Sequence, residues 1–146
     1  MPFVPHSDTD LHQILTRTRT IALVGASANP ERNSYGVMAY LLGQGYVVHP
    51  INPGLAGQQL LGQTVYATLA EVPGPVDMID IFRNSEAAGG VVDDALQERE
   101  RLNLSSVWMQ LNVINEAAAA RAQAQGVEVV MDRCLKIEIN RLGLTA

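Results

Sequence analysis

Cysteine is nearly absent from this sequence: the chain of 146 residues contains one, Cys134. A single thiol excludes an internal disulfide and a zinc site built from several cysteines. Histidine is also scarce, and His6, His12 and His49 show no metal-ligand spacing. We therefore expect no metal centre. The apolar core must stabilise the fold unaided, which is feasible because a chain of this length buries roughly 70% of its unfolded surface.

Long apolar runs and an excess of positive charge are missing too. No apolar stretch approaches the roughly 20 residues that span a membrane. The first ten residues, MPFVPHSDTD, lack the basic and apolar regions of a signal peptide. The formal net charge of -5 disfavours nucleic-acid binding, which needs a basic surface. We expect a cytoplasmic protein without membrane or nucleic-acid partners; a homo-oligomer or an unidentified protein partner stays open.

Short β-type segments alternate with helical patterns along the whole chain. Strands are predicted at residues 20–24, 46–51, 76–82, 105–110 and 127–131, and Pro50 is expected to mark the end of the second. The third alternates enough that one side of it should be partly exposed. Helices are predicted from a cap at Ser7, at residues 35–44, from a cap at Asn84 or Ser85 to residue 102, from a cap at Asn115 over residues 116–124, and at residues 135–142. Residues 52–64 are expected to form a loop with one helical turn.

This alternation predicts an α/β fold with a doubly wound, parallel, five-stranded Rossmann-like sheet and helices on both faces. Residues 1–146 should form one domain, with residues 1–19 as a helical lead-in. In such sheets ligands bind beyond the carboxyl ends of the strands. The residues that follow each strand are therefore the candidate site.

The first strand is followed by Gly25-Ala26-Ser27, and Ser34-Tyr35-Gly36 stands at the start of the next helix. Without a side chain, Gly25 would let backbone approach a phosphate. A helix start offers free N–H groups and a positive dipole end. An alternative is that Gly25 serves only a tight turn and Gly36 only helix–sheet packing. Both interpretations are open at this point.

The second strand ends without an acidic residue. NAD sites usually place Asp or Glu there to bind the ribose hydroxyls. Here the sequence reads Pro50-Ile51-Asn52-Pro53-Gly54, and residues 32–70 contain no carboxylate side chain. This disfavours NAD and is compatible with a 3′-phosphorylated nucleotide such as coenzyme A (CoA). NADP is not excluded.

The other strand ends carry Phe82, Arg83, Gln110 and Cys134. The Arg83 guanidinium could bind a phosphate or form a rim ion pair. Phe82 either closes the pocket or belongs to the core, and Gln110 could accept an amide hydrogen bond from a pantetheine arm. No histidine base follows another strand, so packing is the favoured role for Cys134. We expect a ligand crevice without independent catalysis.

Five motifs in order, VGAS…NSYGV, GYVVHPINPG, VDMIDIFRNS, VWMQLNVINEAA and VVMDRCLKIE, resemble the small stand-alone CoA-binding domain proteins. These are similar to the nucleotide-binding domain of the succinyl-CoA synthetase alpha subunit. The resemblance covers about residues 20–142 and implies binding of CoA or an acyl-CoA. It implies diphosphate contacts from Gly25-Ala26-Ser27 and Ser34-Tyr35-Gly36, adenosine contacts from Asn52-Pro53, a groove lined by Phe82-Arg83, and pantetheine contacts from Gln110.

The sequence departs from the family pattern at two places. The usual lysine after Asn-Pro is replaced by Gly54, so Arg32 or Arg83 must take over its charge or affinity for CoA is weaker. Asn112 stands where glycine is usual.

Two other functions stay open. One is an NADP-dependent oxidoreductase, for which Tyr35 and Asp132 are the only candidate proton-transfer groups; the other is a redox or regulatory module in which Cys134 forms a mixed disulfide with CoA.

Overall fold

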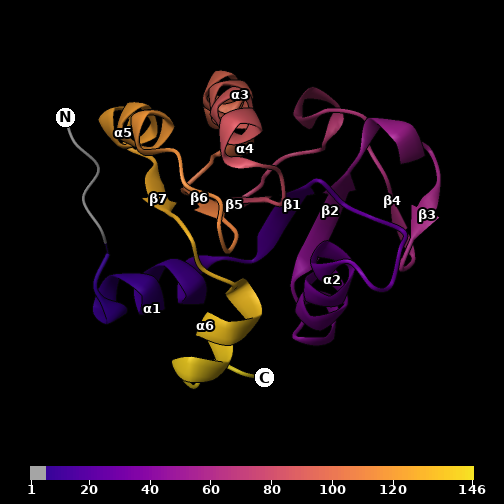
Figure 1. Cartoon of the computed structure of the whole chain (residues 1–146), viewed down its shortest axis with the longest axis horizontal. Coiled ribbons are helices and arrows are strands. Elements are labelled where there is room, and N and C mark those ends of the chain that lie inside the picture. The colour runs from indigo at the N-terminus through magenta and orange to yellow at the C-terminus, as the bar shows by residue number, and fades with distance from the viewer. Residues whose placement is uncertain (1–5) are drawn as a thin grey trace.

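The computed structural model describes residues 6–146 and confirms a five-stranded parallel sheet. Its strands pair in the order β2-β1-β5-β6-β7 (Figure 1). They are β1 Thr20–Val24, β2 Val47–Ile51, β5 Met78–Ile81, β6 Ser106–Met109 and β7 Glu128–Val130. From β1 the chain passes first to β2 on one side and then to β5 on the other, so the direction in which strands are added reverses between the neighbours β1 and β5. A ligand crevice is therefore expected beyond their carboxyl ends.

Helices cover both faces of this sheet, as the doubly wound fold requires (Figure 1). One layer, the α1–α2–α6 layer, consists of α1 Asp8–Arg17, α2 Asn33–Gly43 and α6 Leu135–Arg141. The other, the α3–α5 layer, consists of α3 Ser85–Gln97, the short α4 Arg99–Leu102 and α5 Glu116–Ala124. No helix within residues 6–146 combines the length and the apolar character that crossing a bilayer requires.

Each helix packs through an apolar stripe at helical spacing. Ala88, Val92 and Ala95 of α3 are fully buried against the sheet. Leu11, Ile14 and Leu15 of α1 do the same on the opposite face, where the Trp108 side chain is also fully buried. Spacings of three and four residues place such side chains on one helix face. The sheet thus separates two apolar clusters, one under each layer.

Several helix starts are set by the side chains that the sequence suggested. The Ser7 hydroxyl accepts a hydrogen bond from the Asp10 amide, Asn84 Oδ1 accepts one from the Ala87 amide, and Asn115 Oδ1 accepts one from the Ala118 amide. Each satisfies a backbone donor that the first helical turn leaves without an intrahelical acceptor. The predicted lead-in of residues 1–19 is thus helical from Asp8; its residues 1–5 lie outside the described part of the chain.

Three details differ from the expectation. Strand β2 continues through Pro50 to Ile51. This edge strand tolerates the proline because its nitrogen faces away from β1, and on that outer side the Pro50 carbonyl accepts a hydrogen bond from the Tyr66 amide. The loop after β2 contains the expected helical turn, Pro53–Leu55, but also a hairpin of β3 Gln59–Leu60 and β4 Gln63–Thr64. The helix predicted at 85–102 is interrupted at Glu98.

Strand β5 is buried on both sides, so the predicted partial exposure is wrong for the strand itself; within the predicted range 76–82 only the flanking Asp77 and Phe82 are partly exposed. Asp80 lies in register with Leu23 and Trp108, and its carboxyl therefore faces the α1–α2–α6 layer. Neither of its oxygens has a hydrogen-bond partner within residues 6–146. Burial raises the pKa of the Asp80 carboxyl well above its ordinary value.

Candidate functional site

Backbone contacts join the carboxyl ends of β1, β2 and β5. The amides of Gly25 and Ala26 both donate to the Ile51 carbonyl, at 3.1 and 3.2 Å. Gly25 has φ +93°, and a Cβ there would lie 2.4 Å from the Phe82 carbonyl oxygen. The turn and the close strand contact therefore both require glycine. Because Ile51 occupies the two amides, the donors of an anion site must come from elsewhere.

Asn52 holds the loops after β1 and β2 together. Its Nδ2 donates to the Ala26 carbonyl at 2.8 Å, and its Oδ1 accepts from the Gly54 amide at 2.8 Å. The side chain thus ties the β1 loop to the Pro53–Leu55 turn. These two hydrogen bonds hold the β1 loop and the β2 loop in a fixed relative position.

Free backbone donors lie at the start of α2. The helix begins at Asn33, two residues earlier than expected, so the amides of Tyr35 and Gly36 donate to the Arg32 carbonyl. Within residues 6–146 the amides of Asn33 and Ser34 have no acceptor, and no side chain caps this end of the helix. An uncapped helix start presents N–H groups and positive potential to an anion.

A cavity of about 480 Å³, which we call the loop pocket, opens in front of these amides. Its lining is predominantly polar and contains six of the predicted site residues together with the start of α2. The lining residues are Gly25, Ala26, Ser27, Glu31, Arg32, Asn33, Ser34, Asn52 and Phe82. Six residues predicted from the ends of the strands therefore line one cavity.

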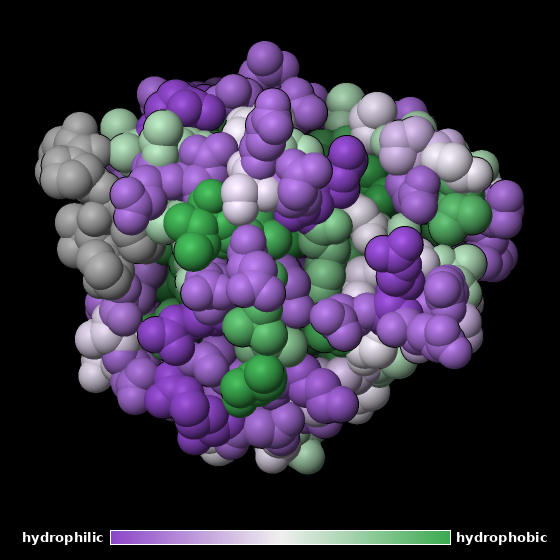
Figure 2. Space-filling model, in the orientation of Figure 1, coloured by the Kyte–Doolittle hydropathy of each residue, from purple (hydrophilic) through white to green (hydrophobic). Residues whose placement is uncertain are grey.

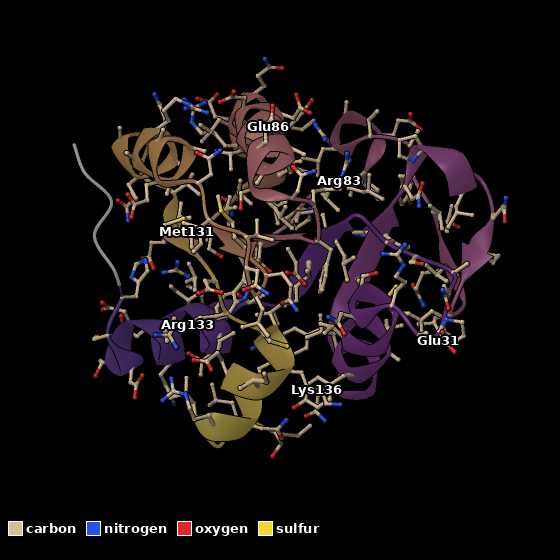
Figure 3. The ribbon with its side chains drawn as sticks, in the orientation of Figure 1. Glu31, Arg83, Glu86, Met131, Arg133 and Lys136 are labelled. Carbon is tan, nitrogen blue, oxygen red and sulfur yellow. The ribbon has the colours of Figure 1, made fainter. Side chains whose placement is uncertain are left out.

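A second cavity of about 440 Å³, the α6 pocket, shares Glu31, Arg32 and Asn33 with the loop pocket. The two adjoin at the start of α2, and Figure 3 shows Glu31 and Lys136 on different sides of that helix. The remaining lining is more apolar: Pro30, Gly36, Val37, Gln110, Leu111, Cys134, Lys136 and Ile137. Leu111 and Ile137 are 43% and 51% exposed, and Figure 2 shows hydrophobic atoms at the surface over α6.

Gly36 and Gln110 are the two predicted residues that line the α6 pocket. No atom lies within 4 Å of the position of a Cβ on Gly36, so the interpretation that this glycine serves helix–sheet packing is wrong. Gln110 is 6% exposed, and its Oε1 has no partner within residues 6–146. A buried amide oxygen without a donor is costly, which makes it a candidate acceptor for a ligand.

Three predicted residues do not line either pocket. Tyr35 is partly buried against the α1–α2–α6 core, and Pro53 begins the exposed 3-10 turn. Arg83 is exposed beyond β5 (Figure 3), with its Cδ 3.2 Å from where a Gly25 Cβ would be. Its side chain makes no ion pair within residues 6–146, so the rim ion pair is not formed there.

Sequence reasoning missed the residues that helices contribute. Glu31 and Asn33 of the α2 start and Lys136 and Ile137 of α6 were not among the predicted site residues. The signal for the first pair was available, since the polar triplet Glu31-Arg32-Asn33, with two charged side chains, stands at the start of the helix. For α6 there was none, because which side of a short helix meets a groove depends on tertiary packing.

The structure also bears on the oxidoreductase alternative and on one departure from the family pattern. Neither Tyr35 nor Asp132 lines a pocket, and Asp132 Oδ1 accepts a hydrogen bond from the Asn112 amide at 2.6 Å. Asn112 has φ +67°, the left-handed conformation in which glycine is favoured and asparagine is tolerated. Residues 6–146 contain no group of three or more metal-ligand side chains.

Comparison with known proteins places this geometry in a family. The family described as "CoA binding domain" matches residues 19–140. The uncharacterized protein YneT of Bacillus subtilis is 33% identical over 131 residues, which are 90% of this chain and 93% of that protein. A hypothetical protein from Pyrococcus horikoshii is 35% identical, with a TM-score of 0.86 over 95% of this chain and 96% of its own.

A larger protein contains a similar unit. The dinucleotide-forming acetyl-coenzyme A synthetase 1 of Ca. Korarchaeum cryptofilum, solved with phosphate and ADP, is 28% identical with a TM-score of 0.67. The match covers 80% of this chain but only 26% of the synthetase chain. The match to the family over most of the chain, together with these relatives, shows that the protein belongs to the CoA-binding domain family.

Proposed function

We propose that this protein binds coenzyme A or an acyl-CoA along the groove that the loop pocket and the α6 pocket form together, and that it does so without catalysing a reaction alone. One observation carries the proposal: a polar cavity and a more apolar cavity adjoin at an uncapped helix start. CoA has the same division, with a phosphorylated nucleotide at one end and a pantetheine arm at the other.

The diphosphate is assigned to the start of α2. The free amides of Asn33 and Ser34 and the guanidinium of Arg32 can donate to it, with Ser27 at the wall of the loop pocket. Arg32 lines both pockets and lies at their junction. It is therefore better placed than Arg83 to replace the family's missing lysine.

The adenosine end is assigned to the loop pocket beside Asn52, and the pantetheine arm to the α6 pocket beside Gln110. No carboxylate follows β2, so nothing there repels a phosphorylated ribose. Glu31 is the one acidic residue that lines the two pockets, and its negative charge partly offsets the positive charge of Arg32. Binding should therefore be moderate in strength and weaker in high salt.

Isothermal titration calorimetry of the full chain with CoA, 3′-dephospho-CoA, NAD and NADP tests the assignment. We expect CoA to bind most tightly and 3′-dephospho-CoA more weakly. Without its 3′-phosphate the ligand has less negative charge to interact with the cationic side chains of the groove, Arg32 and Lys136. Tighter binding of NAD than of CoA would contradict the proposal. Tighter binding of NADP would favour the oxidoreductase alternative.

A further inference from the structure

We propose that Cys134 is a modification site at which coenzyme A forms a mixed disulfide by exchange with CoA disulfide. This rests on the proposed function, because the nucleotide must bring the reactive sulfur to the α6 pocket. Cys134 lines that pocket beside Gln110 and Lys136. The residue is buried, with 7% of its surface exposed, and the α6 pocket is a cavity that it lines.

The independent pointer to a ligand at this thiol is Gln110. Its side chain is nine-tenths buried, lines the same pocket as Cys134, and leaves Oε1 without a donor. The pantetheine arm carries two amide N–H groups and ends in sulfur. A hydrogen bond from one amide to Gln110 Oε1 would satisfy the buried oxygen and hold the arm beside Cys134.

The backbone around Cys134 is fixed on both sides. The Trp108 indole Nε1 donates to the Arg133 carbonyl at 2.8 Å. Arg133 in turn binds Glu138 Oε1 at 2.8 Å, and the Glu138 amide donates to the Cys134 carbonyl at 2.9 Å. A thiol on such a support is presented in one position, which favours reaction with a bound disulfide over reaction with a passing one.

The exchange is balanced without a further oxidant. The Cys134 thiol loses its proton, and the thiolate Sγ attacks one sulfur of CoA disulfide. A bond between Sγ and that sulfur forms as the original S–S bond breaks. The other CoA leaves with the electron pair as a thiolate and takes up a proton. Because the chain has no second cysteine, no internal thiol can reverse the step, and the adduct lasts until an external thiol reduces it.

The test is the intact mass of the full chain during incubation with CoA disulfide at mildly alkaline pH, because the thiolate is the attacking species in disulfide exchange. We expect the addition of one CoA less two hydrogens, one lost from each thiol, with a rate that saturates with CoA disulfide and is lowered by unreactive S-methyl-CoA. Dithiothreitol should remove the adduct, and Cys134→Ser should form none. Pantethine has the same arm and disulfide but no nucleotide, and should react at least about tenfold more slowly.

Gln110→Leu provides a matched variant that keeps the thiol. It should slow the reaction with CoA disulfide but leave the reaction with cystamine, a small disulfide, unchanged. If calorimetry shows CoA binding and no adduct forms, this inference is overturned and the proposed function stands. If CoA does not bind and all the disulfides react at equal rates, both are overturned.

Discussion

The two layers on the sheet differ in what they bury. Beneath the α3–α5 layer the buried cluster is entirely apolar. The buried polar side chains of residues 6–146 all lie on the α1–α2–α6 side: Thr18, Ser34, Asp80, Ser106, Gln110 and Glu138. Both pockets lie on this side as well, at the start of α2 and beside α6.

Not all of these polar groups are satisfied. The Thr18 hydroxyl donates to the Ile14 carbonyl, and Glu138 pairs with Arg133 and Arg141. The oxygens of Asp80 and Ser106, like Gln110 Oε1, have no partner within residues 6–146. Each buried unpartnered group costs about 1–3 kcal/mol. The α1–α2–α6 side thus gives up stability to unpartnered polar groups, while the α3–α5 side supplies apolar packing.

The largest expected effect is that of Asp80→Asn on stability against pH. The raised pKa of Asp80 means that the unfolded chain releases this proton before the folded chain does. Its contribution to stability is therefore complete below about pH 4 and is lost as pH rises through the folded pKa, by up to about 1.4 kcal/mol per pH unit. Asparagine does not titrate here, so the variant should gain on the wild type as pH rises.

Urea unfolding of both proteins between about pH 4 and pH 8 measures this gain. Parallel stability curves would show that folding does not raise the pKa of Asp80, and the polarity contrast between the two sides would then lose its strongest example.

A pair of neighbouring substitutions in β6 compares the two sides directly. Ser106 and Val107 are both fully buried and point to opposite faces. Ser106→Ala removes an unpartnered hydroxyl and should raise the free energy of unfolding by about 1 kcal/mol. Val107→Thr adds a hydroxyl of similar shape to the apolar side and should lower it by about 1–3 kcal/mol. If both changes have the same sign in denaturant unfolding, the layers do not differ in polarity as described.

Much of the fold could be predicted because its signals are local. Hydrophobic periodicity located the five parallel strands, and Ser7, Asn84 and Asn115 marked helix starts that the structure confirms. The rule of strand ends then located the residues that line the loop pocket. These features depend on short stretches of sequence and on the general geometry of parallel sheets.

The remainder depends on contacts between distant segments. That Ile51 occupies the amides of Gly25 and Ala26 follows from the pairing of β1 with β2. The full burial of Asp80 requires α2 and α6 to cover β5, and no local pattern reports this. The contribution of α6 to its pocket was missed for the same reason, since Lys136 and Ile137 have the pattern of ordinary helix residues.

The positive charge of Arg32 at the start of α2 can be compared with that of Arg121 on α5 by its effect on CoA affinity. Arg32 has no capping bond from its side chain, so Arg32→Ala should leave the helix intact and weaken CoA binding about tenfold, or about 1.4 kcal/mol. Arg121→Ala, on α5 in the other layer, should leave binding unchanged. Glu31→Gln should strengthen binding, and Arg83→Ala should weaken it less than Arg32→Ala. Calorimetry that ranks Arg83 above Arg32 would move the diphosphate away from α2.

The smallest expected effect separates stability from binding. Gly36 in α2 and Gly90 in α3 are both exposed helical glycines, and at each the position that a Cβ would take has no atom within 4 Å, but only Gly36 lines a pocket. Alanine at either position should raise the free energy of unfolding by about 0.5–1 kcal/mol, because glycine loses more backbone entropy in a helix. Only Gly36→Ala introduces a methyl group into the proposed path of the pantetheine arm.

We therefore expect Gly36→Ala to be more stable yet to bind CoA more weakly, and Gly90→Ala to be more stable with unchanged affinity. Thermal unfolding and calorimetry on the same two preparations give both quantities. Unchanged affinity in Gly36→Ala would place the arm outside the α6 pocket. Reduced stability in that variant would mean that the space beside Gly36 closes in solution, and the two layers would then differ in packing as well as in polarity.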